Sequence, residues 1–183
     1  MDNGAGSYRR YLNGDEDAFR EIVSEYFDNL VFFIDRLVHD TTAAEDIAID
    51  AFTQLVVNKR RYDFRVSLKT YLFMIGRSRA LDYIKHRKKL TMVELSDAGQ
   101  IPSTAPSIEE LLLADHRKRR ISYALSQLDE PMRLVLHLVY FEDLSVEEAA
   151  KVLKKNRKQI YNLLYRSKQA LRTILREDGE DLL

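Results

Sequence analysis

Aromatic and cationic side chains are interleaved through residues 60–89. Tyrosine and phenylalanine rings can stack on unpaired bases while lysine and arginine follow the phosphates, so this pattern favours single-stranded nucleic acid. Stacking contributes about 1–3 kcal/mol per base, which helps to hold a base outside a duplex. In the alternative interpretation, the rings of Tyr71 and Tyr83 pack in the core and only their hydroxyl groups contact solvent. The candidate contacts are Arg61, Tyr62, Asp63, Arg65, Tyr71, Arg77, Ser78, Arg79, Asp82, Lys85 and His86.

A second set of polar residues lies in a predicted pair of helices, 145–153 and 157–171, which only three residues separate. A turn this short makes the helices cross steeply, so that the second can enter a major groove. The outward side chains include groups that pair with purine edges and cations that bind phosphates. The candidate contacts to duplex DNA are Lys154, Lys155, Arg157, Lys158, Gln159, Tyr161, Asn162 and Arg166.

A third set is acidic. Glu45, Asp46 and Asp50 fall on successive turns of one predicted helix. Carboxylates on an exposed face complement a basic protein partner. The alternative is a helix that carries acids near its N-terminus because they stabilise its dipole.

The elements that carry these residues are predicted to be helices. The 183 residues include only six Gly and three Pro, which favours an all-α protein. Apolar residues recur at helical spacing over 18–30, and 30–38 is a second apolar stretch. Residues 42–45 have the form of a capping box that opens a helix burying positions 47–56. A loop is expected over 60–67 and a last helix over 68–84.

Two small helical domains are predicted, joined by a flexible linker. The first spans residues 8–90 and the second 108–176, because residues 91–107 lose periodicity and gather Ser, Thr, Gly and Pro. Capping boxes mark helix starts at 107–110 and 145–148, with a weaker one at 156–159. Asp129, Glu130 and Pro131 mark another helix start, since proline is tolerated in a first turn.

Composition excludes several classes of protein. The net charge is zero, yet residues 15–58 are acidic and 59–89 basic, so different faces can serve different partners. No cysteine is present and the four histidines are scattered, so neither a metal nor a cofactor is expected. The sequence contains no recognisable nucleophile–base pair and no phosphate-binding loop, so an enzyme is not expected. The absence of a membrane-length apolar run and of a signal peptide indicates a cytoplasmic protein.

Two segments resemble one bacterial family, the extracytoplasmic-function group of RNA polymerase sigma factors. "FRVSLKTYL" followed by "ALDYIK" is similar to the family's second region, and "LDEPMRLVLHLVYFEDLSVEEAAKVL" to its fourth. The resemblance implies that the first domain captures the −10 non-template strand and that the helix pair recognises the −35 element. It implies core polymerase and promoter DNA as partners, with an anti-sigma factor that is often membrane-bound, and no small-molecule substrate. By the same resemblance, the polymerase contacts are Glu45, Asp46, Ile49, Asp50 and Thr53.

The sequence departs from the family pattern where specificity is determined. Gln159 replaces the usual Thr, Val66 a Gly, Tyr71 a Trp and Ser78 an Asn, so the promoter sequence does not carry over. Two other functions stay open. A stand-alone helix-turn-helix regulator would leave the acidic set unexplained, and a helical adaptor that binds only protein would leave the basic face of 157–166 without a role.

Overall fold

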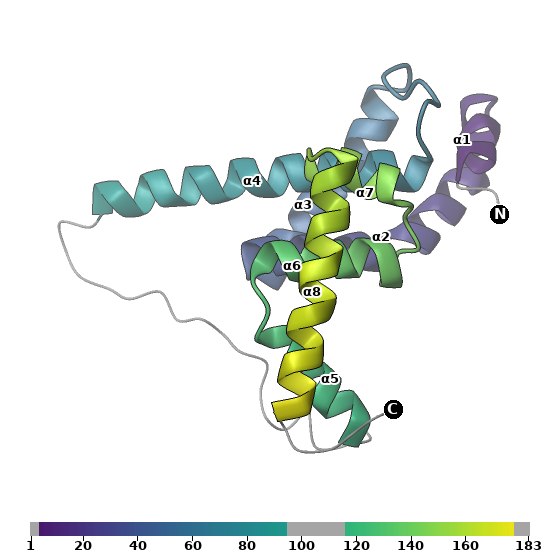
Figure 1. The fold of residues 1–183 in the computed structure, drawn as a ribbon. Coiled ribbons are helices and arrows are strands. Elements are labelled where there is room, and N and C mark those ends of the chain that lie inside the picture. The colour runs from purple at the N-terminus through teal and green to yellow at the C-terminus, as the bar shows by residue number, and fades with distance from the viewer. Residues whose placement is uncertain (1–3, 95–115, 178–183) are drawn as a thin grey trace. The chain divides into compact units, whose positions relative to one another are not determined.

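The computed structural model describes residues 4–94 and 116–177, and their regular structure is entirely helical (Figure 1). The chain divides into two compact units, one holding residues 4–94 and the other most of residues 116–177. The expected all-α fold with two helical domains is therefore confirmed. Over the described ranges, no helix has the length and apolar character needed to cross a membrane. These ranges also hold no cluster of acids and histidines suited to a metal ion.

Over residues 4–94, the first unit contains the helices α1 (Ala5–Leu12), α2 (Glu16–Val38), α3 (Thr41–Val57) and α4 (Leu68–Glu94). Helix α2 is central and contacts each of the other three. Its Phe33 packs against Phe73 of α4 in a tilted arrangement, with ring centroids 5.0 Å apart. Gly76 allows α4 to lie close to α2, because a Cβ atom there would come within 2.9 Å of Leu30.

Two predictions for this unit were wrong. Residues 16–38 form one helix rather than two stretches, because the buried positions from Ala18 to Val38 keep a single helical periodicity against three neighbouring helices. The start of α3 is capped by Asp40 rather than by the predicted box at 42–45: Asp40 Oδ1 accepts from the amide of Ala43 at 3.1 Å. His39 ends α2 in a left-handed conformation, φ 53°, which places Asp40 at the cap.

Other boundaries differ by less. Helix α1 was not predicted, although its Tyr8 is fully buried. Val56, expected in the core, is 38 % exposed at the end of α3. The expected loop at 60–67 is confirmed. Helix α4 continues to Glu94 and so overlaps the predicted linker, whose residues 95–107 lie outside the described part of the chain.

The second unit contains α5 (His116–Ser126), α6 (Glu130–Leu136), the π-helical turn η1 (His137–Phe141), α7 (Val146–Leu153) and α8 (Arg157–Glu177). Helix α8 packs on α5 and α6, and its Ile160 is fully buried. Pro131 lies in the first turn of α6, as expected. The helix predicted to start at 107–110 falls outside the described residues until position 116.

Candidate nucleic-acid interface

The short connection between α7 and α8 is built by a left-handed residue. Lys154 has φ 53°, its amide donates to Lys151 O at 3.3 Å, and the amide of Lys155 donates to Ala150 O at 2.9 Å. This pair of bonds is the Schellman arrangement, which normally places glycine at the left-handed position. It ends α7 abruptly and gives the helix-turn-helix geometry that was predicted.

Both helices of the pair begin with the predicted capping boxes. At α7, the amide of Glu148 donates to Ser145 Oγ at 3.2 Å, and Glu148 Oε2 accepts from the amide of Ser145 at 3.0 Å. At α8, the amide of Gln159 donates to Asn156 Oδ1 at 2.8 Å, and Gln159 Oε1 accepts from the amide of Asn156 at 2.9 Å. Gln159 therefore has a structural role that its prediction as a DNA contact did not include. Its side-chain oxygen is occupied, whereas a paired contact to adenine needs both the oxygen and the nitrogen of the amide.

Arg157 is likewise engaged within the protein. Its Nε lies 2.7 Å from Glu147 Oε1 of α7. A hydrogen bond to Tyr161 and the nearby charge of Glu147 raise the pKa of Arg157. The guanidinium is thereby directed along the α7–α8 junction, which leaves fewer donors for a base edge.

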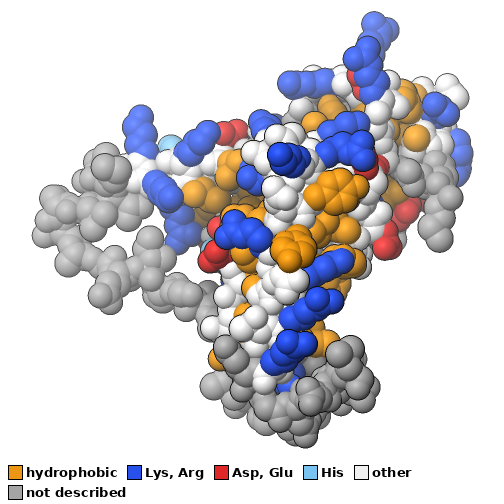
Figure 2. All heavy atoms as spheres, in the orientation of Figure 1, with side chains coloured by type: hydrophobic (Ala, Val, Ile, Leu, Met, Phe, Trp, Pro, Cys, Tyr) orange, Lys and Arg blue, Asp and Glu red, His pale blue; other side chains and the backbone are white. Residues whose placement is uncertain are grey.

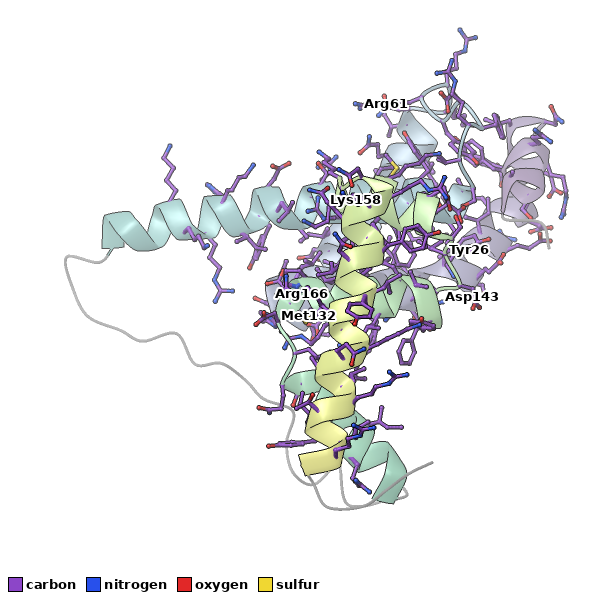
Figure 3. The ribbon with its side chains drawn as sticks, viewed as in Figure 1. Tyr26, Arg61, Met132, Asp143, Lys158 and Arg166 are labelled. Carbon is purple, nitrogen blue, oxygen red and sulfur yellow. The ribbon has the colours of Figure 1, made fainter. Side chains whose placement is uncertain are left out.

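The remaining predicted duplex contacts are exposed. Lys154 and Lys155 lie in the turn, while Lys158, Asn162 and Arg166 lie on α8. Figure 3 labels Lys158 near the start of this helix and Arg166 farther along it, and Figure 2 shows cationic side chains along α8 with hydrophobic ones between them.

Sequence reasoning missed Tyr165, which is 66 % exposed one turn after Tyr161. Its spacing of i+3 from Asn162 and i+7 from Lys158 puts it on their face of the helix. Helical spacing alone could have identified it.

In the first unit, the 58–67 loop between α3 and α4 holds part of the predicted single-strand site. Arg61 and Arg65 are exposed, and Arg61 is labelled on this loop in Figure 3. Asp63 Oδ1 accepts from the amide of Arg65 at 3.1 Å, which forms a tight turn inside the loop. The candidate Tyr62 is only 3 % exposed and donates to Val66 O at 2.6 Å. It packs in the core and cannot stack on a base in this conformation, contrary to its predicted role.

Tyr71, the other aromatic candidate contact, remains partly accessible. It is half-buried at the start of α4, with its ring centroid 5.0 Å from that of Tyr62. Burial raises the pKa of its hydroxyl. Helical spacing places Ser78, Asp82 and Lys85 on the same face of α4 as Tyr71, and Asp82 and Lys85 form an exposed ion pair 3.8 Å long. We call residues 71, 78, 82 and 85 the α4 stripe.

Of the other α4 candidates, His86 lies at the edge of this stripe, one turn after Asp82, whereas Arg77 and Arg79 lie off it. His86 and Arg79 are exposed and Arg77 is half-buried, so the helix does not bring the whole predicted set to one face. Arg79 reaches α3, where its Nη1 is 3.5 Å from Asp50 Oδ2 and its Nη2 is 3.4 Å from Gln54 Oε1.

The acidic set forms one exposed row along α3. Glu45, Asp46, Asp50 and Thr53 are all exposed, and Ile49 is 53 % exposed among them. Ile49 therefore does not pack inward. It borders an apolar groove of about 300 Å³ between α2 and α3, which is lined by Phe19, Val23, Phe27, Ile49, Phe52, Thr53 and Val56. This surface combines an apolar strip with carboxylates, as suits an amphipathic basic helix.

Family comparisons agree with this arrangement. The model of sigma-70 region 2 matches residues 22–90, and the model of sigma-70 region 4 matches residues 118–171. The extracytoplasmic-function sigma factor SigW of Bacillus subtilis is 27 % identical over 177 residues, which cover 92 % of this chain and 95 % of SigW. The chain belongs to the extracytoplasmic-function group of the sigma-70 family.

Other relatives also match this sigma factor over most of its length. SigM of Bacillus subtilis is 24 % identical, over 88 % of this chain and 97 % of SigM. Among solved structures, the sigma factor RpoE of Bartonella quintana, in complex with the anti-sigma factor NepR, is 18 % identical with a TM-score of 0.67. The match covers 86 % of this chain and 96 % of RpoE. CnrH, in complex with the cytosolic domain of CnrY, is 20 % identical with a TM-score of 0.67, over 97 % of this chain and 100 % of CnrH. These two structures share the fold.

The family regions contain the three candidate surfaces of the sigma factor. The acidic row, the 58–67 loop and the α4 stripe lie within the region 2 match, and α7 with α8 lies within the region 4 match. Helix α1 lies before the region 2 match.

Proposed function

We propose that this chain binds core RNA polymerase and directs it to promoters by recognising a −35 and a −10 element. The observation that carries the proposal is the occurrence of both sigma-70 regions, in order, in one chain. The chain acts as a non-catalytic initiation subunit and works in the cytoplasm beside core polymerase.

The second unit recognises the duplex −35 element. Helix α8 enters the major groove, where Lys158, Asn162 and Arg166 contact base edges and phosphates. Lys154 and Lys155 contact the backbone from the turn. Their exposure supports these roles. The capping bonds of Gln159 indicate that its amide NH₂ group is the part available to DNA.

The first unit holds the melted −10 strand. Arg61 and Arg65 contact phosphates beside a base that stacks on Tyr71, and Lys85 and His86 continue the cationic path along α4. The partial accessibility of Tyr71, which is half-buried, supports this assignment over Tyr62, which is buried.

Protein partners use the first unit as well. The acidic row on α3, with Ile49 and its groove, binds a basic helical element of core polymerase. An anti-sigma factor is the proposed regulator. One sigma factor with this fold, RpoE of Bartonella quintana, is described in a complex of that kind, with the anti-sigma factor NepR.

The decisive experiment is reconstituted transcription. The purified chain and core polymerase are mixed with genomic fragments, and transcript 5′ ends are mapped. We expect starts that share two upstream elements and that core polymerase alone does not produce. A stand-alone regulator would bind DNA without creating new transcription starts, and an adaptor that binds only protein would not bind DNA. Failure to direct any initiation contradicts the proposal.

A further inference from the structure

Helix α1 is attached to the 58–67 loop by contacts that run in both directions. Arg9 of α1 lies over the ring of Phe64 in the loop, with its Cζ 4.9 Å from the centroid. Conversely, Lys59 at the start of the loop lies over the ring of Tyr11 in α1, with Nζ 4.5 Å from the centroid. Each segment thus supplies both a cation and a ring to the other.

Tyr8 is the buried centre of this attachment. Its side chain is fully buried, and its hydroxyl lies 3.0 Å from Leu55 O and 3.2 Å from Lys59 O. Two carbonyls thus share one donor, one in the last turn of α3 and one where the loop begins. The ring of Tyr8 also packs edge-on against Tyr62, with centroids 5.5 Å apart.

The conformation of the loop depends on support of this kind. Phe64 has φ 61°, a left-handed backbone that a bulky side chain adopts only where its surroundings hold it. Its ring packs between Arg9 of α1 and Tyr62, whose centroid is 4.6 Å away. Tyr62 in turn contacts Tyr71 on the α4 stripe. A continuous row of rings therefore connects α1 to the aromatic that is proposed to receive the base.

The start of α1 packs so closely against its neighbours that a side chain at position 4 would not fit. Gly4 has φ 74°, and a Cβ atom there would come within 2.9 Å of the Tyr26 ring and 3.1 Å of Leu68 Cβ. Leu68 is the first residue of α4, directly after the loop. The start of α1 is therefore held against α2 and against the first residue of α4, where the 58–67 loop ends.

We propose that α1 fixes the shape of the 58–67 loop before DNA binds, and that Tyr8 and Arg9 are positioning residues for capture of the melted strand. This inference rests on the proposed function of the loop. A loop that is already ordered loses less conformational entropy on binding, so it binds more tightly and distinguishes bases more sharply. Helix α1 thereby adds a determinant of −10 recognition that lies outside the region 2 match.

The test compares neighbouring arginines. Arg9→Gln removes the cation over Phe64, and Arg9→Lys restores a cation. Arg10→Gln is the matched control, because Arg10 is on the same helix but pairs with Asp15 and Glu21 and not with the loop. Tyr8→Phe keeps the ring and removes only the hydroxyl. Each variant is assembled with core polymerase. Binding is then measured to a non-template oligonucleotide from a promoter mapped by transcription and to the same strand with its −10 element scrambled.

We expect Arg9→Gln to lower the ratio of cognate to scrambled affinity by about two- to fivefold, the range of an exposed cation–π contact. Tyr8→Phe should lower the ratio in the same direction. Arg9→Lys should recover most of the loss, and Arg10→Gln should leave the ratio unchanged, with core polymerase binding equal in all variants. Equal effects at Arg9 and Arg10 would overturn the proposal, as would a loss of core binding in step with the ratio.

Hydrogen exchange on the free chain separates this inference from the function on which it rests. If α1 holds the loop, amides of residues 58–67 exchange faster in Arg9→Gln and Tyr8→Phe than in Arg10→Gln. Unchanged exchange overturns the inference even where strand capture is intact. If the wild-type holoenzyme shows no preference for the cognate strand, the assignment of capture to this loop fails, whereas faster exchange would still establish that α1 holds it.

Discussion

Asp50 on α3 and Arg79 on α4 form an ion pair, with the carboxylate Oδ2 and the guanidinium Nη1 3.5 Å apart. The first residue was predicted to bind polymerase and the second DNA. The pair thus connects the edges of the two proposed surfaces of the first unit. Both side chains are about half exposed, so the bond contributes less than about 1 kcal/mol to stability. Either residue can therefore be changed with little effect on the fold.

The double reversal Asp46→Lys, Asp50→Lys tests the polymerase surface. Two positive charges in the acidic row would repel a basic partner, so we expect co-purification with core polymerase to fall by about tenfold or more. Thermal unfolding should shift little. Asp28→Lys, an exposed acid on α2, is the matched control. Unchanged co-purification of the double variant would argue against the surface.

The two roles of Gln159 can be separated by substitution. Gln159→Glu keeps an oxygen that can accept from the amide of Asn156, so the helix start should remain stable, but the amide donor is lost. Gln159→Ala removes this side-chain acceptor but keeps the bond from the amide of residue 159 to Asn156 Oδ1, so it should cost less than about 1 kcal/mol. Promoter-specific transcription that falls equally in both variants would assign Gln159 to DNA recognition. A fall only in Gln159→Ala would leave it a capping role.

Arg157→Ala combined with Gln159→Ala should abolish promoter-specific transcription. The expected cause is loss of the Gln159 amide donor proposed to face DNA and of the ion pair between Arg157 and Glu147. The cap that Asn156 supplies to α8 is retained. Core polymerase binding should persist, because the proposed polymerase surface lies in the other unit. Loss of core binding in a pull-down would contradict the assignment.

Lys154→Gly should have opposite effects on stability and on DNA binding. Glycine avoids the steric cost of the left-handed backbone, so the free energy of unfolding should rise by about 1 kcal/mol. Loss of a phosphate contact should weaken DNA binding uniformly and reduce the salt slope by about one. Urea unfolding and a salt titration measure the two effects. A salt slope equal to that of the wild type would remove Lys154 from the interface.

Tyr71→Ala should impair promoter melting more than duplex binding. Loss of one stacked base corresponds to about 1–3 kcal/mol, or roughly five- to 150-fold. Permanganate reactivity reports melting, and a gel shift on closed duplex reports binding. Tyr71→Phe retains the ring and should retain melting. Equal losses in both assays would indicate a packing role instead.

The stability of the fold at alkaline pH tests the contribution of the buried Tyr8 hydroxyl. Burial raises the pKa of its hydroxyl to about 12, from 10.0 in an exposed tyrosine. The neutral hydroxyl therefore stabilises the fold fully below about pH 10, and its contribution, about 2–3 kcal/mol, is lost as the pH rises through 12. Denaturant unfolding of the wild type and of Tyr8→Phe should show an advantage for the wild type near neutral pH that disappears in this window. Parallel pH profiles would show that Tyr8 is not the group responsible.

The helix-turn-helix could be predicted from the sequence because its signals are local. Ser145 with Glu148 and Asn156 with Gln159 bond to each other across single turns, so their spacing alone marks two helix starts. Asp40 uses the same chemistry, but Thr42 gave a competing pattern two residues later. Only the left-handed His39 decides between them.

The features that could not be predicted depend on tertiary contacts. Helix α1 has only eight residues, too few to be stable alone, and it forms because Tyr8 is buried against α3 and the loop. Tyr62 and Tyr71 are the same residue type and both lie among charged residues in the sequence, so the sequence could not show which of the two is buried. The hydrogen bond from Tyr62 to Val66 determines this.

The α4 stripe has a fixed length because it lies on one uninterrupted helix. Residues 71 and 85 are separated by fourteen steps of about 1.5 Å, or roughly 21 Å along the axis. One residue inserted after Gly76 would turn positions 78, 82 and 85 by about 100° relative to Tyr71. Any strand that followed the original side chains would then lose its path after the first base. Insertions and deletions in this helix should therefore be far more harmful than most single substitutions along it.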